Sequence, residues 1–192
     1  MNAASPMSSS DSVAAKLYRE GKYNAAFQEY LRSATEGNVH AQMFLGWMYK
    51  AGCGTEKNED ESLRWYRAAA EHGYPLAQEL LGVFYYQRGN YVQALEWYEK
   101  AAAQGYMSAL WRLGRMYKKG RGTPIDKEKA YALFQQAAKQ GHTFSKRDLA
   151  MLLIQGHRGI RGFFTGVRLF AESIFDLIRI ARKSESDERI RH

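Results

Sequence analysis

The residues that most often carry out chemistry in proteins are few in this chain and widely separated. The single cysteine, Cys53, can form neither an internal disulfide nor, by itself, a zinc site. No serine, cysteine or aspartate stands in a recognisable nucleophile motif. The histidines show no HExxH spacing, and they stand at positions His40, His72, His142, His157 and His192. The sequence therefore predicts no catalytic residue, no metal site and no cofactor, and we expect the chain not to be an enzyme.

Two glycine pairs have the spacing of a phosphate-binding loop. They are Gly52 with Gly54 and Gly120 with Gly122. Such a loop follows a strand and opens a helix, and neither pair follows a segment with the pattern of a strand. We therefore interpret both pairs as turns between helices that belong to a repeat.

Side chains suited to binding are more prominent than side chains suited to catalysis. The net charge is +8, but the excess of Lys and Arg is dispersed, whereas nucleic-acid-binding surfaces usually carry a denser stripe. One local run of cations contains no acid: Arg112, Arg115, Lys118, Lys119 and Arg121. It is either a solvated helix end, where cations are favourable, or a contact for an acidic partner or a phosphate. A nucleic-acid partner is not expected.

The elements that position these side chains recur along the chain. Glycines stand at Gly37, Gly73, Gly105 and Gly141, at intervals of 36, 32 and 36 residues. Each of them follows a segment of the form A-x-x-x-aromatic-x-x-A-A and precedes one of the form A-x-x-x-L-G-x-x-Y, with some substitutions. Both spacings place small and large apolar residues on one face of a helix. One helix hairpin cannot bury its apolar face alone, so the pattern predicts a stacked all-α array.

Two of these units resemble a known family. They are LGWMYKAGCGTEKNEDESLRWYRAAAEHG (residues 45–73) and LGRMYKKGRGTPIDKEKAYALFQQAAKQG (residues 113–141). Both are similar to Sel-one-like repeats (SLR), a subtype of the tetratricopeptide repeat (TPR). The units around Gly21-Lys22-Tyr23 and Gly89-Asn90-Tyr91 have a shorter turn and look like ordinary tetratricopeptide units. The resemblance covers about residues 11–156 and implies a right-handed α-solenoid that assembles protein complexes, without enzymatic activity.

The resemblance also implies a binding groove, because the first helices of such arrays line the concave face. The family's inward positions correspond here to Trp47, Lys50, Glu79, Tyr86, Trp111, Arg115, Lys118 and Arg147. Aromatic anchors beside cations form a suitable groove for an acidic or helical peptide segment. The alternative for Trp47 and Trp111 is that both pack between repeats.

The C-terminal segment GFFTGVRLFAESIFDLIRIARK, residues 162–183, predicts a helix with an unusually wide apolar face. Because Phe170 follows Phe134 by 36 residues, this helix should occupy the second-helix position of a fourth repeat. Six residues near the middle of its apolar arc should then pack on the preceding helices: Phe163, Val167, Phe170, Ile174, Leu177 and Ala181. Five flanking residues are left for another contact: Phe164, Leu169, Phe175, Ile178 and Ile180.

Three contacts are compatible with these five residues. The helix could cap the array, dock a protein partner or a second copy of the chain, or lie on a membrane surface. Its polar stripe carries both signs of charge, with Glu172 placed to pair with Arg168 or Arg179, which disfavours a membrane. No segment has the composition of a secretory signal or of a spanning helix, so we expect a cytoplasmic location, with attachment to the inner face of a membrane as a variant.

These patterns together predict four segments. Residues 1–10 form a disordered N-terminal tail, 11–156 the SLR/TPR repeat array, 157–183 a capping or interaction helix, and 184–192 a polar tail. The function predicted is that of a non-enzymatic adaptor or scaffold that binds a protein partner through its groove, its C-terminal helix or both. The alternative is a peripheral membrane component of a bacterial envelope or polysaccharide-related complex, anchored by the helix at 162–183.

Overall fold

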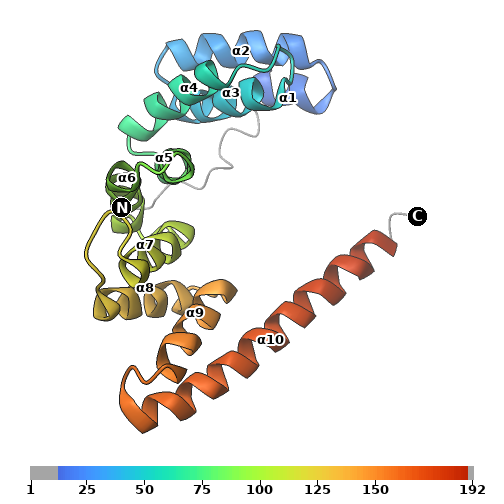
Figure 1. Cartoon of the computed structure of the whole chain (residues 1–192). Helices are drawn as coiled ribbons and strands as arrows, with labels where there is room; N and C mark the ends of the chain where they lie inside the picture. The colour runs from blue at the N-terminus through green and yellow to red at the C-terminus, as the bar shows by residue number, and fades with distance from the viewer. Residues whose placement is uncertain (1–12, 190–192) are drawn as a thin grey trace. The chain divides into compact units, whose positions relative to one another are not determined.

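The computed structural model describes residues 13–189 of the chain, with side chains described up to Arg182. The expected N-terminal tail and the last three residues of the polar tail lie outside the described residues. The described part is helical apart from turns (Figure 1). Its helices are α1 (Val13–Arg19), α2 (Tyr23–Thr35), α3 (Val39–Ala51), α4 (Glu59–Glu71), α5 (Pro75–Gln87), α6 (Tyr91–Ala103), α7 (Met107–Lys119), α8 (Lys127–Lys139), α9 (Thr143–Ile154) and α10 (Gly159–Arg189).

The helices fall into two compact units. Unit 1 is Met1–Arg88 and contains α1 to α5, whereas unit 2 is Gly89–His192 and contains α6 to α10. In both units each helix packs against its neighbours along the chain. Each unit is thus a stack of helix hairpins, and the predicted class, an all-α solenoid, is confirmed.

Within a repeat, the two helices touch where a glycine of the first helix meets an aromatic ring of the second. A Cβ atom on Gly46 would lie 2.7 Å from the Tyr66 ring, and one on Gly114 would lie 2.7 Å from the Phe134 ring. Tyr66 and Phe134 are buried. The L-G dipeptide of the first helix therefore lets the two backbones approach, because any side chain there would collide with the ring.

Hydrogen bonds from buried glutamines link one repeat to the next in unit 1. The Gln42 side chain, on α3, donates from Nε2 to the Ala34 carbonyl oxygen at 3.2 Å. Gln78, on α5, donates in the same way to the Ala70 carbonyl oxygen at 3.1 Å. Each bond adds a second donor to a carbonyl near the end of the preceding helix, which also accepts from the backbone N–H of Gly37 or Gly73.

The glycine pairs are structural, as predicted. Gly52 and Gly120 follow α3 and α7 in the left-handed conformation, with φ of 71° and 66°. Gly122, with φ of 72°, lies so close to α6 that a Cβ atom would stand 2.5 Å from the Tyr91 carbonyl oxygen. The turn of one repeat therefore docks on the start of the preceding second helix, and only glycine satisfies both conditions.

The last helix, α10, packs on α9 as α8 packs on α7, so the repeat register was predicted correctly. The predicted packing face was wrong. The buried residues of α10 are Gly162, Gly166 and Ser173, whereas four of the expected core residues are 36 to 46% exposed: Phe163, Val167, Ile174 and Leu177. The reason lies in the register, because Gly166 and Ser173 follow the buried Ala130 and Ala137 by 36 residues. In every second helix the small residues face the first helix.

The ends of α10 also differ from the prediction. The helix begins at Gly159 and continues to Arg189, through most of the segment expected to be a polar tail. Among the described residues, no helix is long and apolar enough to cross a membrane. The same residues hold no group of three or more acidic, histidine or cysteine side chains placed to bind a metal ion.

The turn glycines give a test of this packing. Gly105 and Gly122 both have positive φ, but a Cβ atom on Gly105 would meet nothing within 4 Å. Gly105→Ala should therefore lower the free energy of unfolding by only about 1 kcal/mol, the cost of the left-handed backbone. Gly122→Ala should lower it by about 3 kcal/mol, because the Tyr91 carbonyl belongs to a helix start and cannot easily move. Urea unfolding followed by circular dichroism measures both, and equal losses would contradict the docking of the turn.

Candidate protein-binding surfaces

In unit 2, the first helices α7 and α9 hold an aromatic residue of the predicted groove in a fixed orientation. The Trp111 indole donates from Nε1 to Asp148 Oδ2 at 2.7 Å. The other carboxylate oxygen of Asp148 lies 3.9 Å from Lys118 Nζ. Asp148 therefore ties two residues of α7 to α9 and restricts the rotamers of the indole ring.

A second ring extends this surface. The centroid of Phe144 lies 5.8 Å from that of Trp111, and the two rings are inclined by 33°. The Arg115 guanidinium lies 4.9 Å from the Trp111 ring centroid, and that of Arg147 lies 5.4 Å from the Phe144 centroid. We call these five residues, Trp111, Arg115, Lys118, Phe144 and Arg147, the unit 2 surface. Two apolar ring faces bordered by cations suit an acidic chain that carries an apolar side chain.

The run of five cations does not form one patch. Arg121 lies over the Tyr91 ring on α6, at 5.4 Å from its centroid, and Lys118 faces Asp148. Arg112 lies 5.6 Å from the Trp111 centroid. The run therefore serves three different contacts within unit 2, and only part of it belongs to the unit 2 surface.

In unit 1, Trp47 belongs to an aromatic cluster rather than standing alone. Its ring centroid lies 5.3 Å from Phe44 and 5.9 Å from Tyr18, and Phe44 stacks on Tyr30 at 4.5 Å. These rings line a pocket of about 590 Å³ together with residues of α1, α2 and α3 and with Tyr74 and Leu76. Trp47 is 38% exposed, so part of its side chain remains accessible.

The structure does not bring the other predicted residues of unit 1 to this pocket. Lys50 is exposed and does not line the pocket, and Tyr86 is half-buried on α5. Glu79 is only 6% exposed, so its carboxylate does not reach the surface and it is removed from the candidate groove. The equivalent repeat positions hold the apolar residues Met43 and Trp111, which already pointed toward burial at this position.

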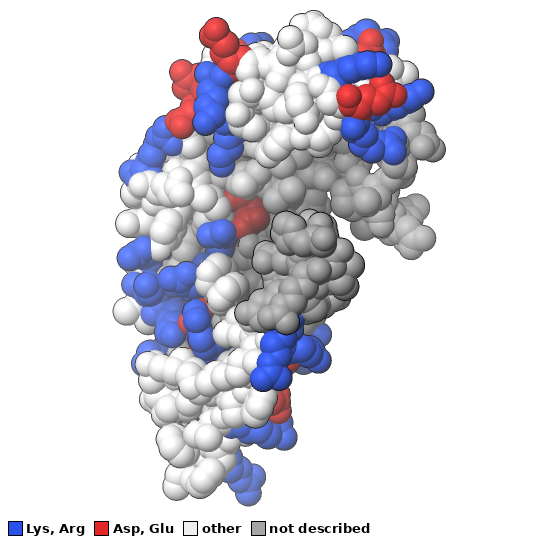
Figure 2. Space-filling model, turned by 90° about the vertical axis from the view of Figure 1, so that its right-hand side faces the viewer, with Lys and Arg blue, Asp and Glu red and all other residues white. Residues whose placement is uncertain are grey.

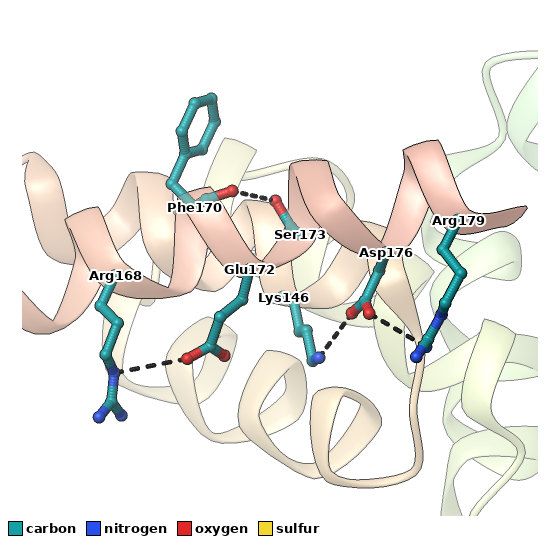
Figure 3. A network of polar contacts seen from close by, with 7 residues as sticks. All are labelled: Lys146, Arg168, Phe170, Glu172, Ser173, Asp176 and Arg179. Atoms are coloured by element: carbon teal, nitrogen blue, oxygen red, sulfur yellow. Dashed lines mark hydrogen bonds and ion pairs between the residues drawn. The ribbon is translucent and has the colours of Figure 1, made fainter. Parts of the chain in front are cut away.

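The polar stripe of α10 is organised by one contact with α9. Lys146 Nζ donates to Asp176 Oδ2 at 2.7 Å, and Arg179 lies 3.2 Å from the other oxygen of Asp176 (Figure 3). Arg168 pairs with Glu172 along the helix at 3.6 Å. The hydrogen bond from Lys146 holds the pKa of the Asp176 carboxyl below its usual value, and Arg179 acts in the same direction.

Sequence reasoning missed Phe144, Asp148 and Lys146. Phe144 stands three positions before the expected groove residue Arg147 and Asp148 one position after it, and the residues at the same repeat positions differ in type. The Trp111–Asp148 hydrogen bond joins residues 37 positions apart. A spacing of one repeat plus one residue was the only signal that could have linked the two side chains.

The repeats of this chain match a known family along most of their length. The model of the Sel1 repeat matches residues 39–74, 75–106 and 108–142, together more than half of the chain. The chain belongs to the Sel1 repeat family. The middle Sel1 match includes the Gly89-Asn90-Tyr91 turn, so that unit is a Sel1 repeat as well, despite a turn that resembles an ordinary tetratricopeptide unit.

Other Sel1 proteins show how far the likeness extends. A putative Sel1-like repeat-containing protein of Acanthamoeba polyphaga mimivirus is 29% identical over 125 residues, which cover 65% of this chain but only 23% of that protein. The solved Sel1 repeat protein from Oxalobacter formigenes is 30% identical, with a TM-score of 0.75 over 83% of this chain and 68% of that one. The c5321 protective antigen of uropathogenic Escherichia coli, described as having an SLR fold, is 28% identical with a TM-score of 0.74, over 82% of this chain and 36% of that one.

The family sets the general role of the repeats. Sel1 repeat proteins are typically non-enzymatic scaffolds, and their repeats generally mediate protein–protein interaction.

The contact between α9 and α10 gives a prediction about pH. Because the pKa of Asp176 is lowered in the folded protein, its charge stabilises the folded state fully above the ordinary pKa of aspartate, about 3.9. This contribution should be lost as the pH falls through the lowered, folded-state value. In Lys146→Met the pKa of Asp176 should rise toward the ordinary value, because the strongest contact of its carboxylate is removed.

Carboxyl carbon chemical shifts followed by NMR during an acid titration measure this pKa directly. Arg168→Met is the matched control, since Arg168 pairs with Glu172 and not with Asp176. An unchanged titration of Asp176 in Lys146→Met would show that the contact between α9 and α10 does not form in solution.

Proposed function

We propose that this chain is a non-enzymatic adaptor whose unit 2 surface binds an acidic segment of a partner protein. The observation that carries the proposal is the pair of rings, Trp111 and Phe144, held side by side between two arginines. A partner segment would place an apolar side chain against the rings and carboxylates against Arg115 and Arg147.

Preorganisation favours this assignment. Binding through a mobile side chain loses about 0.5 to 1.5 kcal/mol per ordered rotamer. The hydrogen bond to Asp148 fixes the Trp111 indole before a partner arrives. Aromatic and arginine side chains also provide most of the strong contacts in protein interfaces.

Charge favours an acidic partner over a neutral one. In the unit 2 surface, Arg115, Lys118 and Arg147 carry three positive charges, and the neighbouring acid, Asp148, faces Trp111 and Lys118. A partner carboxylate would therefore meet a net positive field, which speeds association and selects against basic segments.

The pocket of unit 1 offers a separate apolar anchor point. Trp47, Phe44 and Tyr30 present ring faces to a volume of about 590 Å³, large enough for one or two apolar side chains of a bound peptide. We assign it to the same adaptor role.

We place this role in the cytoplasm, in keeping with a single, unpaired cysteine.

The unit 2 surface can be tested with a matched pair of variants. Selection of a displayed peptide library on the full chain should enrich acidic segments that contain an aromatic or aliphatic residue. Trp111→Ala combined with Arg115→Ala should weaken the selected peptides at least about tenfold, because both an anchor and a cation are lost. Isothermal titration calorimetry or fluorescence anisotropy gives the dissociation constants.

The control is a tryptophan–cation pair elsewhere in unit 2. On the second helix α6, Lys100 Nζ lies 4.0 Å from the Trp97 ring centroid. Trp97→Ala combined with Lys100→Ala removes the same kinds of side chain and should leave peptide affinity within about twofold of the parent protein. Equal losses in both double variants, or affinity that survives the Trp111 and Arg115 changes in a folded protein, would refute the assignment.

A further inference from the structure

The exposed face of α10 repeats every seven residues. Apolar residues recur at alternating intervals of three and four: Ile160, Phe163, Val167, Phe170, Ile174, Leu177 and Ala181. We call these seven residues the α10 seam. This is the spacing of the a and d positions of a coiled coil, sustained over three heptads. The flanking e positions are apolar too, and they hold Phe164, Ala171 and Ile178.

The chain's own packing leaves much of the seam exposed, although Phe170 is half-buried. Ile160 is 79% exposed, and the residues deeper in the seam, Val167 and Ile174, are 46% and 43% exposed. Figure 3 shows Phe170 pointing away from the side of α10 that carries Glu172 and Asp176. In the space-filling view, the lower end of unit 2, where α10 begins, shows few charges (Figure 2). An apolar face of this extent marks an association surface.

The repeat register indicates which kind of structural element packs on this face. Val167 stands where Phe27 and Tyr131 stand in earlier second helices. In those helices the residue contacts a later part of the chain: the Phe27 ring lies 5.2 Å from Tyr49 on α3, and the Tyr131 ring lies 5.1 Å from His157 beyond α9. Within the described residues no helix follows α10. By its register, the part of the seam around Val167 is therefore a face that accepts another helix.

Charge argues for a second copy as that helix. The charged residues of α10 whose side chains are described lie off the seam, and several of them form ion pairs within the chain: Arg168 with Glu172, and Asp176 with Lys146 and Arg179. A partner helix needs no complementary charge, and two seams placed together bring no like charges into contact. A membrane surface would instead favour a uniformly basic polar stripe, which α10 lacks.

The area is sufficient for a stable pair. The exposed apolar surface of the seam and its flanking residues is on the order of the 800 Å² per partner of a standard protein interface. We infer that two copies of this chain associate through the α10 seam to form a homodimer. This pairing is independent of the peptide-binding role proposed above, and in the dimer each adaptor surface is present twice.

Adjacent residues of α10 allow a sharp test. Ile174 lies in the seam, whereas Phe175 lies outside it and is more exposed, at 71%. The full chain should sediment as a dimer at micromolar concentration in analytical ultracentrifugation. Ile174→Glu should weaken the dimer at least about 100-fold, because it buries a charge in an apolar seam. Phe175→Glu should change the dissociation constant less than about threefold.

The outcomes distinguish pairing through the α10 seam from nonspecific hydrophobic association. If Phe175→Glu weakens association as much as Ile174→Glu, the chains associate through a nonspecific apolar patch. The proposed pairing through the α10 seam would then be wrong. If the parent chain is monomeric, the proposal is overturned; co-sedimentation with vesicles of phosphatidylcholine and phosphatidylglycerol would then assign the face to a membrane.

Circular dichroism verifies folding. Should Ile174→Glu unfold α10, Ile160→Glu at the exposed end of the seam serves instead, with a loss of dimer expected and an intact dimer overturning the inference.

Discussion

The contact on which the rest of this protein depends is the close approach of two helices at a residue with little or no side chain. At Gly46 and Gly114 an aromatic ring of the second helix occupies the space where a Cβ atom would stand. Because that contact fixes the distance between the helices, it also fixes which residues remain on the outer faces. The outer faces of these repeats are therefore a consequence of where the small residues stand.

At the last hairpin the glycine of the close contact is on the second helix instead of the first. A Cβ atom on Gly166 would lie 2.8 Å from the Ala150 carbonyl oxygen, so α10 approaches the backbone of α9 directly. The large residues of α10 are consequently turned to the outside. In an interior repeat they would be covered by the following hairpin, and here they form the seam.

The sequence predicted the repeats well because each position recurs up to four times, and chance rarely reproduces several columns at once. It predicted the face of α10 badly because both candidate faces are apolar. A helical wheel ranks Phe163 and Val167 as core and treats Gly162 and Gly166 as neutral, whereas packing against a backbone requires the reverse. The Trp111–Asp148 bond was equally hidden, since it depends on a contact between helices and not on periodicity.

Two kinds of interaction could set the rotation of α10, and their magnitudes decide between them. The ion pairs that reach α10 or the turn before it, Lys146 with Asp176 and Arg158 with Glu128, are both partly exposed, and such pairs contribute about 1 kcal/mol or less each. Turning the helix by one residue, about 100°, would drive a large side chain into the space now occupied by Gly166, at a cost of several kcal/mol. The glycines therefore determine which face is exposed, and the ion pairs only refine the angle. The seam is apolar and outward for a steric reason, which is why it persists whatever the charge state of Asp176.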